Sequence, residues 1–118
     1  PDQSNDSLLA CAESVRDLEY IYLNLGNTQR RSLSDLELSS DFISKSAVGV
    51  SGPTLYPRCL EMTQLLAPLG IPIIATGGIS TVQQVRELQN AGARLCGMAT
   101  ALVMDPYCIV RINSQLTR

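Results

Sequence analysis

Histidine is absent from this chain of 118 residues, and no pair of cysteines has the spacing Cys-x-x-Cys. The usual zinc sites and every catalytic arrangement that needs an imidazole are therefore excluded, and we expect no metal site. The cysteines, Cys11, Cys59, Cys96 and Cys108, fall on predicted apolar helix faces or strands. A thiol there behaves as a small hydrophobic side chain, so we expect reduced thiols in the core of a cytoplasmic protein.

Long apolar runs and basic clusters are also missing. No stretch approaches the roughly 18 apolar residues of a membrane-spanning helix, and the polar start at residues 1–5 is unlike a signal peptide. Arg30-Arg31 is the only basic pair and the net charge is −2, which argues against a nucleic-acid-binding surface. With 45% hydrophobic and 17% charged residues, the composition is that of a globular protein.

The spacing of apolar residues alternates between helical and strand periods along the chain. It predicts helices over 5–17, 55–69, 81–91 and 105–116, and strands over 20–25, 71–76 and 94–100. The intervening segment 26–54 is long for a connection, and its part 29–47 lacks apolar periodicity and should be the least ordered. Such alternation indicates a parallel sheet flanked by helices, and three strands would leave its edges and faces open.

Residues 71–80 combine a predicted strand, two glycines and a helix start. Gly77 and Gly78 permit a sharp turn and a close approach of backbone to a ligand, and Ser80 with Gln83 has the spacing of a capping box. A helix start reached through Gly-Gly leaves unpaired N–H groups directed at one point, which suits a phosphate. An ordinary tight turn between a strand and a helix would explain the pattern as well.

Several short motifs together resemble one family. They are, in chain order, Pro1-Asp2, Asn27-Thr28, Ser51-Gly52 with Pro57, Gly77-Gly78 and Thr100. The chain resembles the C-terminal portion of a dihydroorotate dehydrogenase, an FMN-dependent (β/α)8 barrel, also called a TIM barrel. The resemblance implies an α/β fold in which residues 1–118 form the C-terminal part of a single FMN-binding barrel domain.

The resemblance also implies two sets of binding residues. They are Ser51, Gly52, Gly77, Gly78 and Thr100 for the FMN phosphate, and Asn27 and Thr28 for the pyrimidine. Three of these segments follow predicted strands, and in a barrel such segments meet at the same face. The family's proton-abstracting Ser or Cys and its flavin-contacting lysine lie upstream of the matched portion, so we expect no catalytic residue in this chain.

The implied reaction is the oxidation of dihydroorotate to orotate in pyrimidine synthesis, with quinone or another electron acceptor. The final stretch somewhat resembles the class that passes electrons to quinone, so the full-length protein is expected to be cytoplasmic or peripheral to a membrane. The isolated chain should be inactive. It should also be aggregation-prone, or be held by the missing N-terminal part of the barrel or by a second copy of itself.

Three alternatives remain open at this stage. Gly26, Ala99 and the segment 48–50 depart from the family's usual residues, which allows a divergent member with a shifted substrate. Another phosphate-binding barrel enzyme, such as a histidine- or tryptophan-pathway isomerase, would share residues 71–80 without the other motifs. A non-catalytic half-barrel binding module would share every motif. For Asn27-Thr28 alone, simple turn chemistry is the competing explanation.

Overall fold

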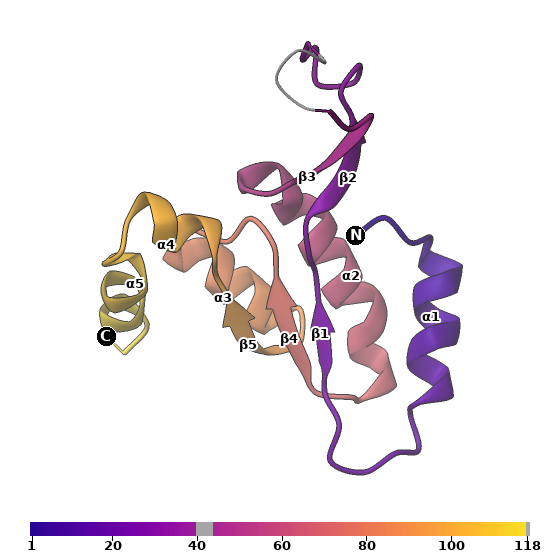
Figure 1. Cartoon of the computed structure of the whole chain (residues 1–118). Helices are drawn as coiled ribbons and strands as arrows, with labels where there is room; N and C mark the ends of the chain where they lie inside the picture. The colour runs from indigo at the N-terminus through magenta and orange to yellow at the C-terminus, as the bar shows by residue number, and fades with distance from the viewer. Residues whose placement is uncertain (40–43, 118) are drawn as a thin grey trace.

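A computed structural model describes residues 1–39 and 44–117 of the chain. Three parallel strands form its main sheet in the order β1-β4-β5: β1 (Leu23–Leu25), β4 (Ile73–Thr76) and β5 (Ala93–Gly97). Helices α2 (Tyr56–Leu66) and α3 (Val82–Asn90) lie behind this sheet in Figure 1. The predicted alternation of helices with parallel strands is therefore confirmed.

The first two helices begin where the sequence predicts. Helix α1 (Asn5–Ser14) follows Ser4, whose side-chain oxygen accepts a hydrogen bond from the N–H of Ser7. Helix α1 packs beside α2 (Figure 1), which carries Pro57 in its first turn, where the missing N–H costs nothing. Two short 3-10 turns, η1 (Pro53–Leu55) and η2 (Ala67–Leu69), flank α2.

The core lies between the sheet and its helices. On β4 the side chains of Ile73 and Ala75 are fully buried, whereas the alternate residues Ile74 and Thr76 are only half-buried. On the same face as Ile74, Leu95 of β5 is 62% exposed, so this face lacks a covering layer in the described part of the chain. Parallel sheets are normally covered on both faces. The core cluster includes Cys59, Met62, Leu66, Ile73, Ala75, Val85 and Leu88.

An antiparallel pair stands where the sequence predicted an irregular loop. Strands β2 (Gln29–Ser32) and β3 (Ala47–Val50) pair from Gln29 opposite Val50 to Ser32 opposite Ala47. The sequence did not predict these two strands, because the polar run of β2 carries no apolar alternation and backbone hydrogen bonds hold the pair instead. Residues 40–43 of the same predicted loop lie outside the described residues.

The N-terminal segment is fixed against α2 and β2 by hydrogen bonds. The Arg58 guanidinium donates to the carbonyl oxygens of Pro1 and Gln3 and to the Asn5 side chain, at 2.6–3.3 Å. The carboxylate of Asp2 accepts from the backbone N–H of Arg30 at 3.1 and 3.2 Å. These contacts place the beginning of the chain beside the start of β2, close to the carboxyl end of β1.

The structure shifts the start of α3 by one residue. The capping box is formed by Thr81 and Gln84 rather than by Ser80 and Gln83. The sequence offers both registers, because a hydroxyl and a glutamine stand three residues apart at either pair, and spacing alone cannot separate them.

The C-terminal elements also differ from the sequence prediction. Strand β5 ends at Gly97, and two helices follow in place of one: α4 (Thr100–Met104) and α5 (Cys108–Leu116). Asp105 is extended, with φ −150° and ψ 95°, and ends α4 instead of capping α5. The cause is Pro106, which disfavours helical geometry in the residue before it. Tyr107 precedes α5.

Gly26 brings β1 against β4 at their carboxyl ends. It has φ +120°, and a Cβ atom built on it would lie 1.8 Å from the carbonyl oxygen of Thr76. We expect Gly26→Ala to destabilise the protein more than Gly70→Ala, because Gly70 has φ +76° with open space around it. Both changes place an alanine at a positive φ that residues with a side chain rarely adopt, at a cost of about 1–3 kcal/mol.

The Gly26 variant should lose a further 1–3 kcal/mol or so, the range typical of overpacking. Urea unfolding of both variants measures the difference. An equal loss of unfolding free energy in the two variants would mean that β1 and β4 can move apart at Gly26 without an energetic cost.

Candidate functional site

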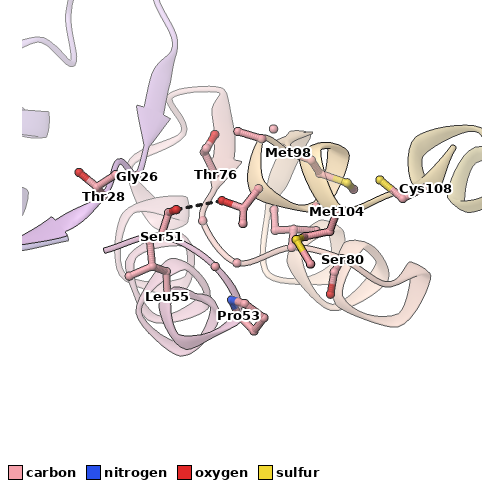
Figure 2. A pocket seen from close by; sticks show the side chains of 18 of the residues that line it. Gly26, Thr28, Ser51, Pro53, Leu55, Thr76, Ser80, Met98, Met104 and Cys108 are labelled. Atoms are coloured by element: carbon pink, nitrogen blue, oxygen red, sulfur yellow. Dashed lines mark hydrogen bonds between the residues drawn. The ribbon is translucent and has the colours of Figure 1, made fainter. Parts of the chain in front are cut away.

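A cavity of about 390 Å³ lies at the carboxyl ends of the parallel strands. Residues that follow β1, β3, β4 and β5 form most of its wall, namely residues 26–28, 51–53, 76–80 and 97–101. Figure 2 shows Thr28, Ser51, Thr76 and Ser80 around this space. Active sites of (β/α)8 barrels are built at this end of the strands.

Every binding residue that the sequence predicted lines this one cavity. The set is Asn27, Thr28, Ser51, Gly52, Gly77, Gly78 and Thr100. The hydroxyl of Thr100 donates to the hydroxyl of Ser51 at 3.0 Å, so the start of α4 is joined to the segment after β3 (Figure 2). Two hydroxyl groups and the backbone of three glycines therefore share one wall.

Gly78 is required by packing, independently of any ligand. It has φ +69°, and a Cβ atom there would lie 2.6 Å from the backbone nitrogen of Tyr56 and 2.8 Å from the carbonyl oxygen of Gly52. The glycine turn and the segment after β3 thus touch backbone to backbone. A larger residue at position 78 would deform this contact, so such a variant cannot test ligand binding by itself.

At the start of α3, the N–H groups of Ser80, Thr81 and Gln84 have partners within the chain. The Gln84 side-chain oxygen accepts from the N–H of Ser80 at 2.8 Å and of Thr81 at 3.1 Å, and the N–H of Gln84 donates to the Thr81 hydroxyl. The expectation that this helix start leaves its N–H groups unpaired was wrong for these residues, because the glutamine side chain folds back over them. The cavity wall before α3 is instead the backbone of Gly77 and Gly78.

Asn27 already makes one local hydrogen bond. Its side-chain oxygen accepts from the N–H of Thr28 at 2.7 Å, which is the turn chemistry considered from the sequence. The amide nitrogen of Asn27 takes no part in that bond. Nearby, the Thr76 hydroxyl donates to the side-chain oxygen of Asn24 at 3.0 Å. The sequence analysis did not identify Asn24 as a residue of interest. The signal was its position between two leucines in β1, which places its side chain on the face of the sheet away from the helices.

Asp105 and Arg111 supply the charged groups among the described residues of the cavity wall. They form an ion pair, and the hydrogen bond from Arg111 holds the pKa of Asp105 below its usual range. The N–H of Tyr107 also donates to the Asp105 carboxylate, at 3.1 Å. Sequence reasoning missed the pair because it placed residues 105–116 in a single helix, whereas Asp105 lies in the turn between α4 and α5.

Behind the wall, Tyr56 joins α2 to α3. Its hydroxyl donates to a carboxylate oxygen of Glu87 at 2.5 Å. Burial, and after it this hydrogen bond, raises the pKa of Tyr56, so the phenol stays protonated at neutral pH. The bond from Tyr56, followed by one from Gln83, lowers the pKa of Glu87.

The cysteines occupy different environments. Cys59 and Cys108 are buried, Cys96 is half-buried, and burial raises the pKa of the Cys59 thiol to about 11. The expectation of a core position was wrong for Cys11, which is exposed on α1 because its neighbour Ala12 takes the buried position. The described residues contain no group of three His, Cys, Asp or Glu that could hold a metal ion. Nor is any helix in residues 1–39 and 44–117 long and apolar enough to span a membrane.

The described residues form an α/β fragment with parallel strands and a cavity at their carboxyl ends, the arrangement found in (β/α)8-barrel proteins. A solved structure of dihydroorotate dehydrogenase from Eimeria tenella, in complex with ferulenol, superposes with a TM-score of 0.80 at 22% identity, over 98% of this chain and 31% of that chain. The model of the family described as dihydroorotate dehydrogenase matches residues 1–118. The chain belongs to the dihydroorotate dehydrogenase family.

Curated relatives match nearly all of this chain. The dihydroorotate dehydrogenase B (NAD(+)) catalytic subunit of Malacoplasma penetrans is 32% identical, over 92% of this chain and 36% of that protein. The corresponding subunit of Listeria monocytogenes is 33% identical over 94% of this chain and 37% of its own length. This chain therefore spans about a third of the length of the relatives it matches.

The Tyr56–Glu87 hydrogen bond should make stability depend on pH. The folded pKa of Glu87 lies below its ordinary value of 4.5, so the bond stabilises the protein above that value. This contribution is lost as the pH falls through the folded pKa. We expect Tyr56→Phe to lower the free energy of unfolding at pH 7, with a smaller difference from wild type at pH 3.

Urea unfolding at the two pH values measures the effect. Tyr107→Phe is the matched control, because Tyr107 is 71% exposed. A difference of the same size at both pH values would contradict a bond to the ionised carboxylate.

Proposed function

We propose that this chain contributes the flavin-phosphate site and part of the substrate clamp to an enzyme that oxidises dihydroorotate to orotate in pyrimidine synthesis. The observation that carries the proposal is the convergence of all predicted binding residues on one cavity at the carboxyl ends of the strands. Membership of the dihydroorotate dehydrogenase family supports the same reaction. The remaining pocket and the base that removes a proton from the substrate would come from outside residues 1–118.

The donor set of the cavity fits a phosphate group. The hydroxyls of Ser51 and Thr100 lie 3.0 Å apart, and the backbones of Gly52, Gly77 and Gly78 line the same wall. Because glycine has no side chain, a phosphate oxygen can come close to the backbone N–H groups at these positions. Barrel enzymes often bind phosphate between the loops after two neighbouring strands and the start of a short extra helix, here β4, β5 and α4.

Asn27 and Thr28 would contact the pyrimidine ring. The Asn27 side-chain oxygen is engaged by the N–H of Thr28, so the Asn27 amide nitrogen is the group offered to a carbonyl of the ring. Gly49 packs against Thr28, because a Cβ atom on Gly49 would lie 2.6 Å from the Thr28 hydroxyl oxygen. The β2–β3 pair therefore fixes the position of Thr28 at the cavity.

FMN, when bound, would accept a hydride from C6 of dihydroorotate while a base takes the proton from C5. The residues of this chain would orient the two molecules, Asn27 and Thr28 from the side of the ring and Ser51 and Thr100 from the phosphate. The relatives named as NAD(+)-type catalytic subunits favour NAD⁺ over quinone as the final acceptor, reached through a partner subunit.

One purification separates the proposal from its alternatives. The full-length protein should purify with FMN, identified by chromatography after denaturation, and dihydroorotate should bleach the flavin absorbance. Bound FMN without bleaching would favour a non-catalytic binding module. Absence of flavin would favour another phosphate-binding barrel enzyme.

Loss of a hydroxyl at the phosphate site should weaken flavin binding. We expect Ser51→Ala or Thr100→Val to raise the FMN dissociation constant about tenfold or more, since hydrogen bonds to charged groups contribute roughly 1.5–3 kcal/mol each. Flavin fluorescence titration of the apoprotein measures this. Thr54→Val is the matched control, because Thr54 is exposed and lies next to the cavity segment without lining it. Equal affinity in all variants would exclude these hydroxyls from the phosphate site.

Asn27 allows its turn role to be separated from its substrate role. Asn27→Asp keeps the side-chain oxygen that accepts from Thr28 but removes the amide donor. We expect this variant to keep its flavin and its stability. Its KM for dihydroorotate should rise about tenfold or more, because a ring carbonyl would lose its hydrogen-bond donor. Leaving such a group unpaired costs roughly 1–3 kcal/mol. An unchanged KM, with Asn27→Ala destabilised, would leave Asn27 with the turn role alone.

A further inference from the structure

The ion pair of Asp105 and Arg111 is not used by the flavin-phosphate site described above. Both residues line the cavity, Asp105 from the turn after α4 and Arg111 from the first turn of α5. Their side chains are 38% and 59% exposed, so both remain accessible to a molecule that enters the cavity.

The pair lies within electrostatic reach of the phosphate residues. Helix α4 runs from Thr100 to Met104, which is about 6 Å along the helix axis at 1.5 Å per residue, and Asp105 follows directly after it. The Debye length at physiological ionic strength is about 8 Å, so a charge at Asp105 is not fully screened from a phosphate beside Thr100.

The two partners are held differently. The Asp105 carboxylate is fixed by the N–H of Tyr107 and by the turn that Pro106 imposes, so its negative charge stays at the wall. Arg111 reaches that carboxylate from the neighbouring helix and offsets its charge. A guanidinium carries five N–H donors, so Arg111 can serve both a carboxylate and a phosphate oxygen.

We propose that Arg111 strengthens and Asp105 weakens the preference of this cavity for phosphorylated over unphosphorylated ligands, so that the two members of the pair tune it together. The inference rests on the proposed function and names a specificity determinant for the same site. Arg111 without Asp105 attracts a phosphate more strongly, and Asp105 without Arg111 repels it. The two members of one ion pair therefore act on phosphate selectivity in opposite directions.

The test compares FMN with riboflavin, which lacks the phosphate, by fluorescence titration of the full-length apoprotein. The measured quantity is the dissociation constant of riboflavin divided by that of FMN. Arg111→Gln should reduce this ratio about tenfold, which is the order of magnitude expected from the loss of one unit charge close to the phosphate. Asp105→Asn, which keeps an oxygen for the Tyr107 N–H, should raise the ratio severalfold. Arg111→Lys should keep most of the preference, and the double neutral variant should return close to wild type.

Controls come from the opposite end of the strands. Arg16 and Asp17 line a second cavity beside Ile71 and Pro72, which precede β4, so Arg16→Gln and Asp17→Asn alter net charge without touching the first cavity. These two variants should leave the ratio unchanged.

Two outcomes would overturn the inference. A shift of the ratio in the same direction in Arg111→Gln and Asp105→Asn, or no shift in either, would mean that the pair has a structural role only. Binding of neither flavin by the wild-type protein would overturn the proposed function itself, and this inference with it.

Discussion

The contact between the backbone of Gly78 and the backbones of Gly52 and Tyr56 is the constraint on which the cavity depends. It brings the turn after β4 against the segment after β3, two parts of the chain that belong to different units of the fold. The hydroxyl bond between Ser51 and Thr100 then adds the start of α4 to the same wall. Backbone packing at one glycine therefore assembles a site from segments that are far apart in the sequence.

The sequence was sufficient for the parts of the fold that follow from periodicity. The apolar run of β4 and the apolar stripe of α2 show which side chains are buried in the core. Parallel topology then places the carboxyl ends of the strands at one edge of the sheet. Motifs located the cavity residues because turn glycines and hydroxyls are tied to strand ends. The hairpin of β2 and β3 was not predictable in this way, since Arg30 and Arg31 carry no apolar signal.

Two further features depended on choices that spacing cannot make. Ser80 and Thr81 each stand three residues before a glutamine, and only packing selects Thr81 as the cap. Pro106 lies at the start of the helix predicted over 105–116, but its stronger effect is to keep the residue before it out of helical geometry. The ion pair of Asp105 and Arg111 follows from that geometry, so an error in one turn concealed the charged part of the site.

The hydrogen bond from Arg30 to Asp2 has a consequence for association between chains. Strand β2 pairs with β3 on one side, and the N–H of Arg30 is bonded instead to the Asp2 carboxylate. An incoming strand that tried to extend the hairpin at this edge would find the donor occupied and a negative charge in its path. Natural sheets protect exposed edges in this way against edge-to-edge aggregation. The beginning of the chain thus shields the hairpin from unwanted pairing.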